Sequence, residues 1–335
     1  MLCVALCAAV VSATAIGAVH ISAWHTLDIL LNQTGIVHLP RTWAPTDEII
    51  VVQLRLPRVL GAALVGAALA SAGTLFQALL RNPLADPLLL GTSAGAALGA
   101  TIAFMLPTIV WLGFGVVALL AFAGALLAVA AVYALASRHG QTPVVTLLLA
   151  GVAVSAVLTA GQTLLIVLDP VLAEHIISLY LWLAGGIAVQ SWAQLGAIGL
   201  LVAFGLLGAI YLSPTLDTFA LGEEIATYLG VRVERQKLAI VGVAALLVAA
   251  AVSISGLVGF VGLVAPHACR LVLGPGHRRL VPASALVGAT FVVLADALAR
   301  TLAAPAELPL GVLTALVGGP FFLLLLRHAG QGYRW

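Results

Sequence analysis

The chain has 335 residues, of which 63% are hydrophobic and only 8% are charged, and its formal net charge is +2. Soluble globular domains carry roughly 25% charged residues, so this composition excludes an ordinary soluble fold. Apolar runs long enough to cross a bilayer as helices, which takes about 20 residues each, recur along the whole length. The sequence therefore predicts an all-α polytopic membrane protein with a single transmembrane domain over residues 1–335.

We predict ten transmembrane helices from these runs. They cover residues 2–23, 57–79, 88–106, 113–136, 144–168, 191–212, 238–256, 258–271, 280–299 and 309–327. The first run has no basic residue ahead of its apolar core, and the chain never becomes soluble after it. We therefore interpret it as a span rather than as a secretion signal.

The distribution of basic residues supports ten spans with both termini in the cytoplasm. In that topology ten of the 14 Lys and Arg residues are cytoplasmic, and the other four are Arg41, Arg55, Arg58 and Arg300. Fusing spans 238–256 and 258–271 into one would leave six basic residues inside and eight outside. Cytoplasmic loops carry an excess of Lys and Arg, so the two short spans are kept separate.

A hydrolase pattern in the sequence favours helix packing instead of catalysis. The segment GTSAG at 91–95 fits the G-x-S-x-G motif around Ser93. That motif requires a strand followed by a sharp turn into a helix, whereas this segment lies in an apolar helical run. Gly91, Gly95 and Gly99 recur every four residues, which is typical of a ridge for close helix contact.

Metal and nucleotide motifs are missing from the sequence. There is no H-E-x-x-H, and the eight histidines show no metal-site spacing. Cys3, Cys7 and Cys269 predict neither a disulfide framework nor a zinc site. The only lysine, Lys237, follows Gln236, so the chain has no P-loop. We expect no cofactor in this chain, and any ATP and Mg²⁺ must bind to a separate subunit.

A charged island interrupts the apolar sequence between 220 and 235. Leu221, Ile225 and Leu229 recur every four residues, whereas Glu223 and Glu224 fall on other faces. The spacing predicts a short amphipathic helix facing the cytosol, with Gly222 and Gly230 at its ends. Interfacial helices that rest on lipid usually carry Lys and Arg on their polar face. Paired glutamates favour a protein partner.

Eight sequence blocks occur in a fixed order along almost the whole chain. They are RLPR at 55–58, RNPLADP at 81–87, LLLAG at 147–151, ALGEEIATYLG at 220–230, GFVGLVAPHACR at 259–270, GHRR at 276–279, DALAR at 296–300 and ELPLG at 307–311. With these blocks the chain resembles the permease subunits of the ATP-binding-cassette (ABC) importers for cobalamin, iron siderophores and heme.

The resemblance implies a multi-pass permease of the bacterial cytoplasmic (inner) membrane without catalytic activity of its own. Its expected partners are a second copy of the chain, two cytoplasmic ATPase subunits, a periplasmic substrate-binding protein and the lipid bilayer, but no nucleic acid. The resemblance also implies that the cytoplasmic loop 213–237 couples the permease to the ATPases. The expected coupling residues are Leu221, Gly222, Glu223, Glu224, Ile225, Tyr228 and Gly230.

On the outer side, the resemblance implies that Arg55, Arg58 and Arg300 receive acidic residues of the binding protein. Arginine suits this role because its planar guanidinium binds carboxylates with two parallel hydrogen bonds. A second reading is structural, because Asp296 lies four residues before Arg300 and would pair with it inside the membrane. Both roles stay open for Arg300.

The resemblance also maps a cytoplasmic gate onto RNPLADP and the start of the fifth span. The gate residues expected there are Asn82, Leu84, Val144, Val145 and Thr146. The cobalamin permease has small hydroxyl residues where this chain has Val144 and Val145. An apolar constriction suits a flat apolar ligand, so heme is favoured over siderophores and cobalamin.

The main alternative is an ion- or proton-coupled secondary transporter. Such proteins usually place ionisable groups near the middle of the membrane. Here almost every charge maps to a loop or to the end of a span, and Asp296 has Arg300 nearby. A membrane-embedded enzyme using Ser93 is a more distant alternative.

Overall fold

The computed structural model describes residues 1–17, 19, 21–33, 35, 39–107, 110–111, 113–138 and 140–329. Within these ranges the chain is helical except for loops and a short antiparallel ribbon of β1 (Val110–Trp111) and β2 (Phe114–Gly115). The helices in chain order are α1 (Leu2–Ala15), α2 (Ala23–Gln33), α3 (Pro45–Ile49), the π-helix η1 (Ile50–Arg55), α4 (Leu56–Leu79), the 3₁₀ turn η2 (Pro87–Leu90), α5 (Thr92–Phe104), α6 (Val116–Ala136), α7 (Val144–Leu168), α8 (Pro170–Leu183), α9 (Trp192–Ala220), α10 (Glu223–Tyr228), α11 (Val233–Ser255), α12 (Val261–Leu273), α13 (His277–Thr301) and α14 (Leu310–Ala329).

Every predicted span overlaps one of these helices. Among the described residues, six helical segments are long and apolar enough to cross a membrane: Pro45–Leu79, Val116–Ala136, Val144–Leu168, Trp192–Ala220, Val233–Ser255 and His277–Thr301. Five shorter apolar helices lie in α1, α5, α8, α12 and α14. The all-helical, polytopic architecture is therefore as predicted, whereas the count of ten crossings stays a prediction.

Several boundaries differ from the prediction. Helix α1 ends at Ala15 instead of reaching residue 23. Helices α2 and α8 are additional, because no predicted span covers them. The helix expected from 57 begins at Pro45, because α3, η1 and α4 are continuous. Helix α9 continues past 212 and through Pro214 to Ala220, so the first part of the segment 213–237 is helical. Proline is tolerated inside helices of membrane proteins.

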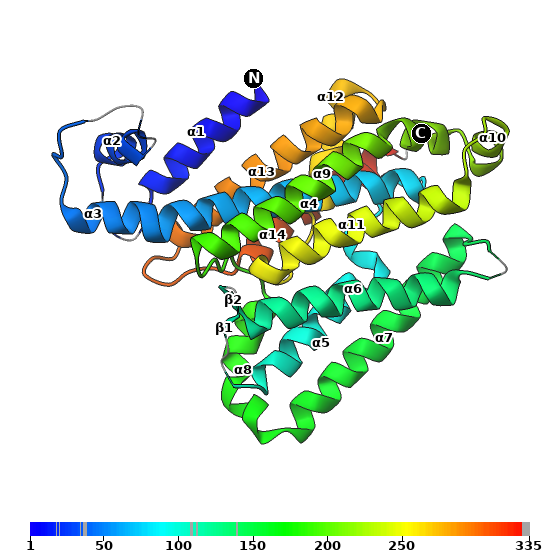
Figure 1. Ribbon diagram of the computed structural model, residues 1–335, viewed down its shortest axis with the longest axis horizontal. Helices are drawn as coiled ribbons and strands as arrows, with labels where there is room; N and C mark the ends of the chain where they lie inside the picture. Colours follow the sequence, from blue (N-terminus) through cyan, green and yellow to red (C-terminus); the bar gives the residue numbers. More distant parts are fainter. Residues whose placement is uncertain are drawn as a thin grey trace.

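Helix α4 is the centre of the main helical layer, where it packs against α9, α11, α12 and α13 (Figure 1). Small residues allow these backbones to approach closely. A Cβ added to Gly73 on α4 would collide with the carbonyl oxygen of Gly262 on α12, and one added to Gly66 would collide with Gly288 on α13. The amide of Gln77 also donates to the Gly262 carbonyl, at 3.2 Å. Small residues and interhelical hydrogen bonds are how membrane helices associate without a hydrophobic driving force.

Helices α5, α6, α7 and α8 form a second group below α11 in Figure 1, and α6 packs against α11. The predicted packing role is confirmed for Gly95 and Gly99, because a Cβ on them would collide with the α6 carbonyls of Gly124 and Leu120, whereas Gly91 precedes α5 with φ +85° and has no such close contact. Helix α7 is different, because it buries only Leu147, Gly151 and Gln162 although it is apolar along its length. Most of its surface is therefore open to lipid or to another chain.

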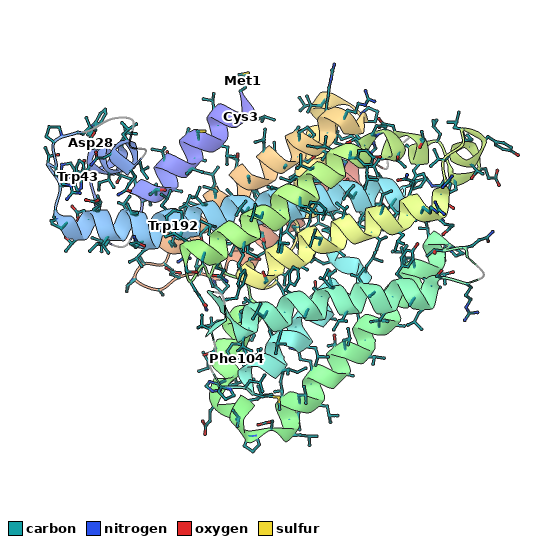
Figure 2. All side chains as sticks on the ribbon, viewed as in Figure 1. Met1, Cys3, Asp28, Trp43, Phe104 and Trp192 are labelled. Atoms are coloured by element: carbon teal, nitrogen blue, oxygen red, sulfur yellow. The ribbon has the colours of Figure 1, made fainter. Side chains whose placement is uncertain are left out.

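The two ends of the molecule have different character. At one end lie α10 and the turn between α6 and α7, on the right in Figure 1; this is called the α10 end below. At the other end α2 and η1 enclose a small separate core of Ile21, Ile29, Trp43 and Val51. The Trp43 indole donates to Glu48 at 3.2 Å. Figure 2 shows Asp28 and Trp43 together at this α2 end.

Candidate functional site

The predicted amphipathic helix exists as α10, and its two ends are fixed by glycine. Gly222 precedes it with φ +112° and Gly230 follows it with φ +84°, which are backbone conformations that side chains disfavour. The amide of Val231 donates to the Ala226 carbonyl, and that of Gly230 to the Thr227 carbonyl. This pair of bonds is the Schellman motif, which stops a helix and satisfies its last carbonyls.

The apolar side chains of this segment point away from the protein. Ala226 is the one fully buried residue of α10, whereas Leu221, Ile225 and Leu229 are exposed and Tyr228 is 91% exposed. An amphipathic helix normally buries its apolar face against its own core. This helix presents that face outward at the α10 end, as a docking element for another surface would.

A wide groove lies beside α10. It has a volume of about 640 Å³ and is lined by Gln141, Pro143, Glu223, Glu224, Thr227, Val231, Arg232, Val233, Glu234, Arg235 and Lys237. The groove joins α10 and the start of α11 to the turn that precedes α7. Three carboxylates and three basic groups give it a mixed charge, which suits a protein surface better than an apolar ligand.

The two predicted coupling glutamates differ in their surroundings. The carboxylate of Glu223 forms an ion pair with Lys237 Nζ at 2.7 Å. Glu224 is exposed and has no ion-pair or hydrogen-bond partner within the described part of the chain. The role of both residues toward an ATPase stays a prediction, and the structure leaves Glu224 more available for it.

The predicted gate residues occupy two separate segments. The Asn82 side chain accepts the Leu84 amide at 2.9 Å, which shapes the turn after α4. Val144, Val145 and Thr146 form the first turn of α7, where Val145 is exposed and the other two are half-buried. The closing of a path by these two segments stays a prediction.

Asp86 anchors the first gate segment. Its carboxylate accepts the Leu88 amide at 2.8 Å and also bonds the amide of Phe260, before α12. Burial raises the pKa of the Asp86 carboxyl above its usual value. The hydrogen bonds from the backbone amides of Leu88 and Phe260 lower this pKa, but their effect is smaller than that of burial. The turn after α4 is therefore fixed to the loop between α11 and α12.

At the opposite end, two of the predicted docking arginines are buried inside the chain. Arg55 and Arg300 are each 7% exposed. Arg55 donates to the carbonyls of Thr14, Ala15 and Val19. Arg300 donates to the carbonyls of Ala13 and Ile16, both at 3.0 Å. Both guanidiniums thus satisfy the free carbonyls at the end of α1, where the helix dipole also favours positive charge.

Arg58 is the more accessible of the three arginines and joins two carboxylates. Its Nε donates to the buried Asp296 at 3.1 Å, and its two terminal nitrogens bind Glu307 at 3.0 and 2.9 Å. Asp296 also accepts from Arg300 Nε at 3.0 Å, as the i, i+4 spacing predicts. The structural role of Arg300 is confirmed, and the docking role of the three arginines stays a prediction.

The surroundings of Ser93 and the described His, Cys, Asp and Glu residues bear on catalysis and metal binding. Ser93 lies in α5, a helix that follows a 3₁₀ turn rather than a strand, and its hydroxyl has no hydrogen-bond partner among the described residues. Within the same described ranges, no group of three or more His, Cys, Asp or Glu residues could hold a metal ion.

Sequence reasoning missed Lys237, Glu234 and Glu307 as site residues. The sequence analysis used Lys237 to exclude a P-loop and to count the cytoplasmic basic residues, but not as a site residue. A lone lysine beside the charged island was the available signal, but its partners are 3, 14 and 95 residues away. Helical spacing brings Glu234 and Lys237 together, but it does not show pairs that are 14 or 95 residues apart.

Comparison with known proteins decides the family. A sequence model described as the FecCD transport family matches residues 4–328. The chain belongs to the FecCD transport family. The resemblance inferred from the eight sequence blocks is thereby confirmed, and it identifies this FecCD chain as a transport permease and not as a catalytic enzyme.

The names of the relatives of this FecCD permease mention different substrates. The cobalamin import system permease protein BtuC of Halobacterium salinarum is 45% identical over 282 residues, which are 84% of this chain and 74% of the relative. The hemin transport system permease protein HmuU of Yersinia pestis is 44% identical over 288 residues, 84% of each chain. These identities are nearly equal, so sequence similarity does not select a substrate.

Solved structures agree with the fold. A structure described as an inward-facing, metal-chelate type ABC transporter has a TM-score of 0.81 and 31% identity, and the match covers 98% of this chain and 97% of that one. The PsaBC structure from Streptococcus pneumoniae has a TM-score of 0.54 and 18% identity, with 80% and 90% covered. At that identity it supports the fold alone.

Proposed function

We propose that this FecCD permease is the transmembrane subunit of an ABC importer that carries an iron chelate, a corrinoid or heme across the bacterial inner membrane. Two copies of the chain form the path, and two cytoplasmic ATPase subunits supply ATP and Mg²⁺. A periplasmic binding protein delivers the ligand. Alternating access of the cavity between the two copies then moves the ligand to the cytoplasm.

The observation that carries this proposal is the outward apolar face of α10 beside a charged groove. Ile225 and Tyr228 are exposed, and α10 carries paired glutamates instead of the Lys and Arg that helices resting on lipid usually have. A helix of this kind, seated in a cleft of a moving subunit, transmits rigid-body displacement to its neighbouring helices. The P-loop missing from the sequence is then supplied by that partner.

The unburied face of α7 supports the second copy. This helix is apolar along its length but buries only three of its residues. Its first turn carries the proposed gate residues Val144 and Val145, together with Thr146. A partner copy packed against this face would place two such turns opposite each other, with Asn82 and Leu84 contributing from the turn after α4.

Heme is the favoured ligand within this proposal, ahead of ferric siderophores and cobalamin. The two valines give the constriction an apolar lining that suits a flat apolar molecule. In the same family reading, Arg58 receives an acidic side chain of the binding protein on the outer face. Its two hydrogen bonds to Glu307, which is 54% exposed, support this role, because they give an example of a carboxylate bound by this guanidinium.

Uptake by reconstituted vesicles tests the function. Proteoliposomes would contain the chain with its co-purified ATPase, with ATP in the lumen and heme, a ferric siderophore or cobalamin delivered outside by the binding protein. We expect accumulation that requires ATP, and fastest for heme. Accumulation that proceeds without ATP and stops with a protonophore would contradict the importer and favour a secondary transporter. Faster uptake of siderophore or cobalamin would overturn the preference for heme alone.

A further inference from the structure

We propose that Lys237 is a positioning residue that ties the docking helix α10 to the first turn of α7. Displacement of α10 then reaches Val144 and Val145 through this side chain as well as through the backbone. The inference rests on the proposed function for its consequence in transport. The tie, by which we mean the hydrogen bonds of Lys237 that connect α10 to the segment before α7, is a property of this chain and can be measured without an ATPase.

The ammonium of Lys237 uses all three of its hydrogen-bond donors inside the chain. Nζ lies 2.7 Å from Glu223 on α10, 3.1 Å from Glu234 on α11 and 2.9 Å from the carbonyl of Thr142. Lysine has three donors and no acceptor. No donor is left for a partner protein, although the side chain lines the groove, so its role is internal.

Glu234 completes the connection on the other side of Thr142. One of its oxygens bonds Lys237, and the other accepts the Thr142 amide at 2.9 Å. Both backbone polar groups of Thr142 are thus held by this cluster, and Thr142 is itself buried. Helix α7 begins two residues later, at Val144. The segment before the predicted gate is therefore fastened to α10 and α11 at one point.

Burial makes this connection stiff. Lys237 is 3% exposed, whereas the side chains of Glu223 and Glu234 are 39% and 35% exposed, so the ammonium is shielded from bulk water and the two carboxylates are partly solvated. Removing one partner of a buried ion pair leaves an uncompensated charge, which is strongly unfavourable. Separating α10 from the start of α7 is correspondingly unfavourable, and the two segments move together.

The other predicted gate segment also reaches α10. Arg81, the first residue after the turn that ends α4, has φ +48°, an uncommon conformation for a residue with a side chain. Its guanidinium lies beside Gly222, where a Cβ would be 3.6 Å from Nη1. The turn holding Asn82 and Leu84 is thus in contact with the start of the docking helix.

Hydrogen exchange of the full chain in lipid nanodiscs tests the tie. Lys237→Met keeps the length of the side chain but removes its charge and donors. We expect at least a ~10-fold faster exchange in peptides covering 140–147 and 221–230, with no change in the centre of α4. Glu223→Gln is a milder second variant, and it should accelerate 221–230 more than 140–147. Lys237→Arg, which retains donors, should restore most of the protection.

Three results of that experiment would overturn the proposal. One is unchanged exchange in 140–147 in Lys237→Met, and another is an equal rise along the whole chain, which would indicate a general structural role. The third is a variant Lys237→Arg that behaves as Lys237→Met. Arg278→Gln is the matched control, because Arg278 is exposed at the first turn of α13 and should leave both peptides unchanged.

Coupling is measured on the complex with its ATPase. We expect Lys237→Met to keep ATP hydrolysis within about 2-fold of the native rate but to lower ligand uptake per ATP at least ~5-fold. Unchanged uptake per ATP would overturn the role in transmission. Failure of the native chain to retain an ATPase would instead refute the proposed function, and the exchange result would still decide whether the tie exists.

Discussion

The buried carboxylate of Asp296 should be a main determinant of stability at the α2 end of the molecule. Asp296 is 1% exposed and lies between Arg58 and Arg300. It accepts from Arg58 Nε and from Arg300 Nε, and Arg58 Nη2 is also 3.1 Å away. Changing Asp296 to Ala removes these contacts and leaves the Arg300 guanidinium buried without a counter-charge.

The expected loss follows from the remaining partners. Breaking a buried ion pair costs about 3–5 kcal/mol. Arg300 keeps its two carbonyl acceptors on α1 and Arg58 keeps Glu307, so the loss should lie near the lower end of that range, about 3 kcal/mol. Asp296→Asn keeps an acceptor but loses the charge, and should cost about half as much because charge-assisted bonds are about twice as strong as neutral ones.

Equilibrium unfolding of the purified chain in mixed micelles measures these free energies. Glu307→Gln is the control, because Glu307 pairs with the same Arg58 but is 54% exposed, and exposed ion pairs contribute about 0–1 kcal/mol. The reasoning fails if Asp296→Ala costs less than about 1 kcal/mol, or if Glu307→Gln costs as much as Asp296→Ala.

Three further predictions concern other segments. Gly95→Leu should lower the yield of monodisperse protein, measured by gel filtration, at least ~5-fold, because the leucine side chain would collide with Gly124. Gly196→Leu is the control and should keep the native yield, because the space beside Gly196 is open. Equal yields of the two variants would contradict this prediction. Burial raises the pKa of Asp86, so ionisation disfavours the folded state above that pKa. The stability advantage of Asp86→Asn over the native chain should therefore shrink as pH falls from 7.5 toward 4.5, and a constant gap in unfolding free energy would refute it. Ser93→Ala should change no hydrolytic activity, measured on ester and peptide substrates, since Ser93 has no base beside it.

Local sequence features predicted the helices well where the signal was itself local. The start and end of α7 coincide with the prediction, because a Pro143 N-cap and Asp169 bound an uninterrupted apolar run. Helix α10 stops before Gly230 as expected, because the left-handed conformation of Gly230, with φ +84°, favours glycine. Arg300 and Asp296 pair as their i, i+4 spacing predicts.

Features that depend on distant parts of the chain escaped the sequence analysis. The end of α1 at Ala15 cannot be read from its apolar run, because its last carbonyls bind Arg55 and Arg300, 40 to 287 residues away. A Cβ at Gly17 would collide with the Arg55 guanidinium, which explains that glycine only once the fold is known. Likewise, the sequence analysis did not find the ion pair of Glu223, because its partner Lys237 belongs to the next helix.

The most direct test of the account is a pull-down of the tagged chain from its native membranes in mild detergent, scored for a P-loop ATPase. The native chain should retain such an ATPase in stoichiometric amount. Tyr228→Asp, which places a charge on the outward face of α10 without touching the Lys237 cluster, should lower that amount at least ~10-fold, and Arg278→Asp should retain it. A native chain without an ATPase, or a Tyr228→Asp variant that binds it as well as the native chain, would contradict the docking role of α10.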